Sequence, residues 1–156
     1  MEKKYIVIIL LIIILIFIGV GFYTYNNSTN NQNSTVKVGD LYFNMPNGYI
    51  QGTPNKLGDV TLSNGKNPIF ITYYNDTNIT KYINKFNDSV EKNGETIDIK
   101  NFTTNDLLVY KATINESGMV NYWFIKNDKI YSIYSWSKID NVDIIFSELI
   151  NSKKNN

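Results

Sequence analysis

The pattern of hydrophobic and polar positions changes sharply near residue 25 of the 156-residue chain. Residues 5–23, YIVIILLIIILIFIGVGFY, contain no charge, and as a helix they would span about 28 Å, close to the hydrocarbon thickness of a bilayer. Lys3 and Lys4 precede this segment, so the positive-inside rule predicts a cytoplasmic amino terminus. The alternative is a cleaved signal peptide with a small-residue site at Gly19-Val20-Gly21. We expect an uncleaved single-pass anchor in residues 1–25, with the following domain outside the cell membrane.

Residues 26–35, NNSTNNQNST, contain no apolar side chain, so they cannot bury surface to offset the entropy of ordering. This composition predicts a flexible linker. Asn26, Asn27 and Asn33 each begin an N-x-S/T triplet and are candidate glycosylation sites in an exported segment. The whole chain is rich in Asn, Ile, Lys and Tyr, which have AT-rich codons, so such triplets also arise by chance.

From residue 36 the pattern becomes one of short alternating runs. It predicts strands on either side of Gly39-Asp40, a turn at residues 46–48, and strands at residues 60–62 and 69–74 around an Asn64-Gly65 turn. A helix is predicted next, capped by Asp76 or Thr77 and ending near Gly94, because apolar residues recur at helical spacing. These residues are Ile79, Tyr82, Ile83, Phe86 and Val90.

The runs LLVYKATI, MVNYWFIK and KIYSIYSWS predict three antiparallel strands after a strand at residues 95–102. Loops of about four and two residues would place Ile114 opposite Met119, Tyr110 opposite Trp123, and Ile125 opposite Ile130. One face is then continuously apolar and is expected to be core. It carries Leu108, Tyr110, Ala112, Ile114, Met119, Trp123, Ile125, Ile130, Tyr134 and Trp136. The other face is mixed in polarity, with Val109, Lys111, Thr113, Val120, Tyr122, Phe124, Tyr131, Ile133 and Ser135.

A second helix is predicted over residues 142–150, where apolar residues again form one stripe. The order of elements predicts an α+β domain over residues 36–152, followed by a polar tail at residues 153–156. We expect a twisted, mainly antiparallel sheet flanked by two helices and preceded by one transmembrane helix.

Missing residue types restrict the chemistry of this chain. It has no His and no Cys, and every one of its 15 basic residues is lysine. Imidazole catalysis, disulfides, thiolate metal sites and guanidinium clamps are therefore excluded within the chain. The formal net charge of +1 also argues against nucleic acid as a partner. We expect no cofactor and no metal.

Any enzymatic activity would have to use carboxylates, hydroxyls or lysine. A cell-surface hydrolase with two carboxylates, or with Ser135 and Lys138 of the SWSK run, is the alternative function. The acidic residues are scattered and fit turns and helix surfaces better than a paired site. We therefore expect a protein that is not an enzyme.

The best candidate binding residues are the aromatic set Tyr122, Phe124 and Tyr131, together with Lys111. Planar rings on an open sheet can stack on sugars or clamp a peptide. The same rings can equally pack under a helix, and the sequence leaves both alternatives open.

The entry LYFNMPNGYI, the mid-chain helix, the hairpin YWFIKNDKIYSI and the terminal helix together resemble the PsbP-like fold group. The pattern is also similar to small single-pass surface proteins of AT-rich archaea and bacteria. The resemblance covers about residues 36–152 and implies an α+β domain without a catalytic motif. PsbP-like members include extrinsic photosystem subunits and bacterial lipoproteins, but this chain lacks the lipoprotein cysteine. We expect an anchored, non-catalytic domain that binds an envelope protein or glycan.

Overall fold

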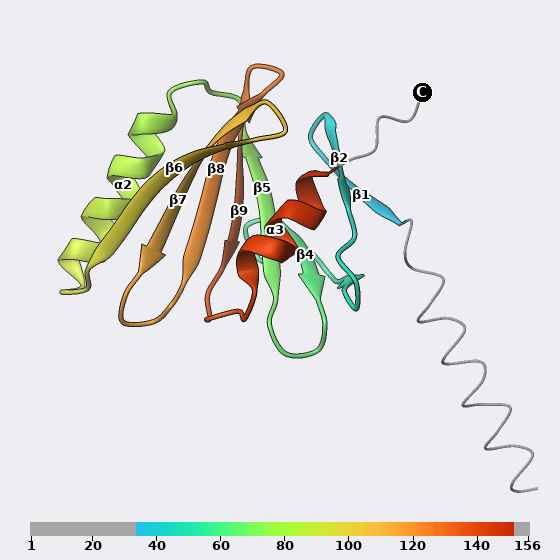
Figure 1. Ribbon diagram of the computed structural model, residues 1–156, viewed down its shortest axis with the longest axis horizontal. Coiled ribbons are helices and arrows are strands. Elements are labelled where there is room, and N and C mark those ends of the chain that lie inside the picture. The colour runs from blue at the N-terminus through green and yellow to red at the C-terminus, as the bar shows by residue number, and fades with distance from the viewer. Residues whose placement is uncertain (1–33, 152–156) are drawn as a thin grey trace, which may run out of the picture. The chain divides into compact units, whose positions relative to one another are not determined.

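The computed structural model describes residues 34–151, in which five strands, a helix, four strands and a second helix follow one another (Figure 1). The first strands are β1 Thr35–Val38, β2 Leu41–Asn44, β3 Ile50–Gln51, β4 Val60–Ser63 and β5 Ile69–Tyr74. They are followed by α2 Ile79–Lys92, β6 Ile97–Thr104, β7 Leu107–Ile114, β8 Val120–Lys126, β9 Lys129–Ser135 and α3 Val142–Ile150. The predicted α+β class with two helices is confirmed.

The predicted membrane anchor at residues 5–23 and nearly all of the predicted linker lie outside the described residues. Neither helix within residues 34–151 combines the length and the apolar character needed to cross a membrane.

Seven strands form one sheet in the order β3-β4-β5-β9-β8-β7-β6, and all neighbours are antiparallel. Two-residue turns join β6 to β7 and β8 to β9, and Asn127 and Asp128 in the second turn have φ of 51° and 56°. Asn and Asp tolerate this left-handed backbone, which suits a tight hairpin. The predicted pairs are confirmed: Tyr110 lies opposite Trp123, and Ile125 lies opposite Ile130. The N–H of Ile114 also donates to the carbonyl of Met119, as the predicted loop requires.

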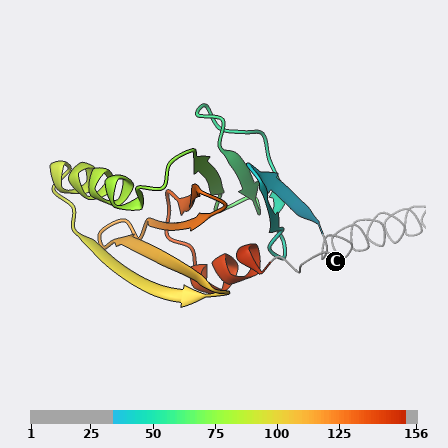
Figure 2. The ribbon, with the colours of Figure 1, turned by 90° about the horizontal axis from the view of Figure 1, so that it is seen from above.

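The larger hydrophobic core lies on the sheet face covered by α3 and the β1–β2 hairpin, while α2 covers the opposite face (Figure 2). This larger core lies on the sheet face whose sequence is mixed in polarity. The continuously apolar face was predicted to be the core, so the predicted ranking of the two faces by burial is wrong. The members of the larger core from the central strands are all at most 3% exposed: Val109, Val120, Tyr122, Phe124, Tyr131 and Ile133. The β1–β2 hairpin explains the difference, because its Phe43 comes from far along the chain to pack on Phe124 and Tyr131.

A smaller core lies between α2 and the other face, where Ile79, Ala112, Trp123 and Ile130 are buried together. The ring of Phe86 meets Trp123 edge-on at 5.2 Å between centroids. The helix begins one or two residues later than the predicted caps Thr77 and Asp76 would place it, because Asn78 is its N-cap and accepts a hydrogen bond from the N–H of Lys81. Asp76 instead accepts a hydrogen bond from the N–H of Asn78, which supports the cap from outside the helix.

Candidate functional site

The aromatic residues that the sequence singled out for binding lie in the larger core. Tyr122 and Phe124 are each 1% exposed, and Tyr131 is fully buried. The ring of Tyr122 stacks on Phe146 of α3 at 4.1 Å between centroids, and Phe124 stacks on Tyr131 at 5.5 Å. The packing alternative therefore describes these rings, which have no surface left on which a sugar or peptide could stack.

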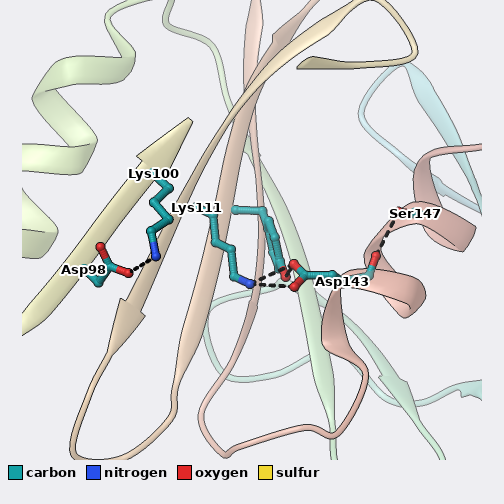
Figure 3. A network of polar contacts seen from close by, with 6 residues as sticks. Asp98, Lys100, Lys111, Asp143 and Ser147 are labelled. Carbon is teal, nitrogen blue, oxygen red and sulfur yellow. Dashed lines mark hydrogen bonds and ion pairs between the residues drawn. The ribbon is translucent and has the colours of Figure 1, made fainter. Parts of the chain in front are cut away.

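Lys111 and Tyr122, the charged and phenolic members of the same set, meet at the carboxylate of Asp143. Figure 3 shows the Lys111 side chain pointing toward this carboxylate. The ammonium group of Lys111 lies 2.8 Å from both carboxylate oxygens of Asp143, and the Tyr122 hydroxyl donates to Oδ1 at 2.6 Å. Ser147 lies one turn further along α3 and donates from its hydroxyl to the Asp143 carbonyl. Sequence reasoning did not select Asp143, because no local spacing links it to β7 or β8.

The pKa shifts of Tyr122 and Asp143 favour a structural role for this network over a reactive one. Burial raises the pKa of the Tyr122 phenol above its ordinary value of 10.0, and the hydrogen bond to Asp143 raises it further. Partial burial also raises the pKa of Asp143, but the hydrogen bonds from Lys111 and Tyr122 lower it by more, so its net pKa falls below the usual value. The carboxylate thus stays ionised and the phenol neutral near pH 7. Both are poorly suited to exchange a proton with a substrate, since each is held in its ordinary state.

The face that carries α2 is only half covered by that helix, which packs mainly against β6 and β8. On the other half, Phe70 of β5 lies directly opposite Tyr134 of β9, and their rings stack at 5.1 Å. Trp136 follows β9 and meets Tyr134 edge-on at 5.4 Å. We call Phe70, Tyr134 and Trp136 the aromatic shelf.

The exposure of Trp136 corrects a sequence prediction. Tyr134 and Trp136 were both expected in the core, and Tyr134 is indeed only 6% exposed, but Trp136 is 60% exposed. The indole lies just beyond the end of β9, where no helix among residues 34–151 covers the sheet. An exposed indole that rests on a buried tyrosine offers a fixed apolar surface, because its partner cannot move aside.

A buried polar contact fixes the underside of the shelf to the loop between β3 and β4. The Tyr134 hydroxyl donates to Asp59 Oδ2 at 2.6 Å, and the Asn55 side-chain amide donates to the same oxygen at 2.9 Å. The Asn55 side-chain oxygen in turn accepts from the N–H groups of Leu57 and Asp59. Burial first, and then the hydrogen bond to Asp59, raise the pKa of Tyr134 above its ordinary value. The loop is therefore held in one conformation beside the shelf, with Leu57 79% exposed.

The opposite end of the same face has a shallow hollow of about 160 Å³. Leu108 and Ile125, which the sequence placed in the core, are 50% and 39% exposed there. The remaining lining residues are Ile79, Asp106, Leu107 and Tyr110. The hollow is apolar and smaller than most ligand pockets, so it is a weaker candidate than the shelf.

A second space, beneath α3, has about 10 Å³, which is room for at most one water molecule.

The residues of the alternative hydrolase are not arranged as a reactive pair. Ser135 is 1% exposed, and its hydroxyl bonds to the backbone of Ser137 instead of to Lys138. In the described part of the chain, four acidic residues instead form ion pairs with lysine, namely Asp40 with Lys129, Asp76 with Lys81, Asp98 with Lys100, and Asp143 with Lys111. Within residues 34–151, no group of three or more acidic side chains is placed to hold a metal ion.

The candidate glycosylation sites Asn26, Asn27 and Asn33 lie outside the described residues. No protein-family model matches this chain, and no curated protein is significantly similar to it. The resemblance to the PsbP-like group therefore stays a prediction from the sequence pattern.

Proposed function

We propose that this protein is a membrane-anchored, non-catalytic domain that faces outward and binds a glycan or a protein of the cell envelope through the aromatic shelf. The observation that carries this proposal is Trp136, which is 60% exposed yet fixed against Tyr134. Exposed aromatic side chains on a rigid support are the usual anchors of binding surfaces. The charge-free segment at residues 5–23 supports the membrane anchor.

Trp136 can supply a useful share of the binding free energy. Burying the exposed part of an indole is worth about 2–3 kcal/mol, from about 25 cal/mol per Å² of apolar surface. A flat indole beside Phe70 and Tyr134 suits the C–H face of a sugar ring or the apolar side chains of a protein.

Cosedimentation of the full-length chain, in mild detergent, with envelope fragments of the source cells tests the proposal. Trp136→Ala is expected to weaken binding about tenfold or more, because about 1.4 kcal/mol corresponds to each factor of ten. The matched control is Tyr42→Ala, which removes an aromatic ring that is 56% exposed on β2, away from the shelf. Equal binding by the wild type and Trp136→Ala would rule out the shelf. Envelope fragments stripped of protein by protease distinguish a glycan ligand, which retains binding, from a protein ligand, which does not.

Tryptophan fluorescence gives a second readout of the same contact. Trp123 is 3% exposed and reports the core, whereas Trp136 reports the shelf. Binding at the shelf is expected to shift the emission to shorter wavelength and to protect it from iodide quenching. In Trp136→Phe the emission comes from Trp123 alone, and this change should vanish.

Protease treatment of intact cells tests the orientation. An outward-facing domain is degraded without lysis. A domain that is degraded only after lysis would contradict the proposed topology.

A further inference from the structure

Strand β6 is a long, unpaired edge of the sheet. The two edges are β3, which has two residues, and β6, which has eight. Most of β6 is exposed or half-buried, and within residues 34–151 no other strand covers its outer side. A long edge with free N–H and C=O groups can pair with another strand.

The hydrogen bonds at the start of β6 show which residues direct their backbone groups outward. The N–H of Asn115 donates to the carbonyl of Thr96, so Thr96 faces β7. Ile97 pairs with Ile114, whose N–H points away from it toward Met119. Because these directions alternate along an antiparallel pair, alternate residues from Ile97 onward present their N–H and C=O to solvent. The outward set is Ile97, Ile99, Asn101 and Thr103.

The side chains of β6 alternate in a way that suits pairing with an identical strand. Asp98 and Lys100 lie on one face and form an ion pair at 2.6 Å (Figure 3), while Ile99 between them lies on the other face and is 39% exposed. We propose that β6 pairs antiparallel with β6 of a second copy of this chain, in a register centred on Ile99. Ile99 then lies opposite Ile99 of the other copy, and Asp98 of each copy lies opposite Lys100 of the other.

Among the registers centred on Asp98, Ile99 or Lys100, charge and backbone direction together favour the one centred on Ile99, which places Asp98 opposite Lys100. Centring the pair on Lys100 would place two lysines opposite each other, and centring it on Asp98 would place two aspartates opposite each other, both of which are unfavourable. Centring it between two residues would set outward backbone groups against inward ones. The Ile99 register instead joins Ile99 to its copy and Ile97 to Asn101 in both directions, with about six backbone hydrogen bonds.

The alternative role of Asp98 and Lys100 is to guard the edge against association, because charged side chains on edge strands commonly do so. A guarding role predicts a monomer. A guarding role does not require the opposite charges of Asp98 and Lys100 to lie symmetrically on either side of Ile99. The two interpretations therefore differ in a measurable oligomeric state.

Ile99→Pro is the most selective variant for the test. It removes an N–H that points to solvent, so the bonds from β6 to β7 remain intact. Sedimentation equilibrium of the full-length chain in mild detergent should show a dimer for the wild type and for the control Ile99→Thr, which keeps the N–H. Ile99→Pro should raise the dimer dissociation constant at least tenfold, with an unchanged circular dichroism spectrum. A monomeric wild type, or a dimer that Ile99→Pro leaves intact, would overturn the proposal, including the case of association through residues 5–23.

Charge exchange tests the register itself. Asp98→Lys and Lys100→Asp each place like charges opposite each other in a homodimer, so each variant should dimerise more weakly than the wild type. The two variants mixed together should form a heterodimer, because lysines on one chain then face aspartates on the other. The mixture isolates the contact between chains, since neither variant retains the Asp98–Lys100 ion pair within a chain. Failure of the mixture to associate better than either variant alone would refute the Ile99 register.

Discussion

The hydroxyl group of Tyr122 on β8 donates a 2.6 Å hydrogen bond to Asp143 in the first turn of α3. The same tyrosine ring stacks on Phe146 of that helix, so one side chain supplies both an apolar and a polar contact. Lys111 completes the arrangement by pairing with the carboxylate from β7. The position of α3 on the sheet is therefore specified by a polar contact at its edge as well as by apolar packing.

Removing only the hydroxyl of Tyr122 should loosen this contact. Tyr122→Phe is expected to lower the free energy of unfolding by about 1 kcal/mol, which is below the usual range for a hydrogen bond to a charged group, because the Asp143 side chain is 64% exposed and solvent screens it. Urea unfolding of the full-length chain measures the change. Tyr110→Phe is the control, since the Tyr110 hydroxyl makes no hydrogen bond within residues 34–151, and it should change stability little. Equal losses from the two variants would show that the Tyr122 hydrogen bond contributes nothing specific.

Alkaline pH should destabilise the domain through its buried phenols. Burial, followed by a carboxylate partner, raises the pKa of Tyr122 and of Tyr134 above the ordinary value of 10.0. A folded-state pKa above the unfolded value gives stability that is complete below about pH 10 and declines as pH rises further, because only the unfolded state then releases the protons. Urea unfolding between about pH 9 and pH 11 measures this decline. Tyr122→Phe combined with Tyr134→Phe should flatten it, and an unchanged slope in the double variant would contradict the assignment.

Acid should loosen the start of α2. The N–H of Asn78, followed by Lys81, lowers the pKa of Asp76 from 3.8 to about 2. A lowered folded-state pKa gives stability that is present above the unfolded value, so it is lost as pH falls from about 4 toward 2. Thermal unfolding followed by circular dichroism should show a smaller loss over this range for Asp76→Asn than for the wild type. Asp88→Asn removes a charge from the same helix without touching the cap, and an identical effect of the two variants would indicate a general charge effect.

The local elements of this fold could be predicted from the sequence, whereas the covering of its sheet could not. Asn127-Asp128 between two β-rich runs identifies the β8–β9 hairpin, and the register follows from the loop length. Which sheet face is more deeply buried depends on Phe43 and Phe146, which approach from opposite ends of the domain. The polar groups of Lys111 and Tyr122 also made their sheet face look less suited to burial than the other face. Both groups instead bond to Asp143 at the edge of the core.

The candidate site shows the same limit, because its exposure depends on which parts of the sheet are covered. An aromatic residue in a β-rich run looks alike whether it lies under a helix or just beyond a strand end. Tyr122, the candidate for binding, is buried, as the packing alternative allowed, whereas Trp136, which was predicted in the core, is exposed. The only sequence signal for Trp136 was its place at the end of its run, next to Ser137 and Lys138, where strand pairing and helix cover both stop.

Among the glycines of residues 34–151, Gly118, in the loop between β7 and β8, should be the least tolerant of a methyl group. Its φ is +68°, and an added Cβ would lie 2.9 Å from the Cβ of Lys138. Gly48 is a matched control, because its φ is +79° and an added Cβ would meet no atom within 4 Å. Left-handed strain costs about 1–2 kcal/mol for a residue with a Cβ, so Gly48→Ala should lower the free energy of unfolding by about that amount.

Gly118→Ala adds steric overlap to the same strain and should cost about 1 kcal/mol more than Gly48→Ala in urea unfolding. Removing the opposing side chain isolates the overlap. In a Lys138→Gly background, the cost of Gly118→Ala should fall to that of Gly48→Ala, because the difference comes from contact between two side chains. If Gly118→Ala costs the same with and without the Lys138 side chain, overlap with Lys138 is not what requires glycine at this position, and backbone conformation alone accounts for it.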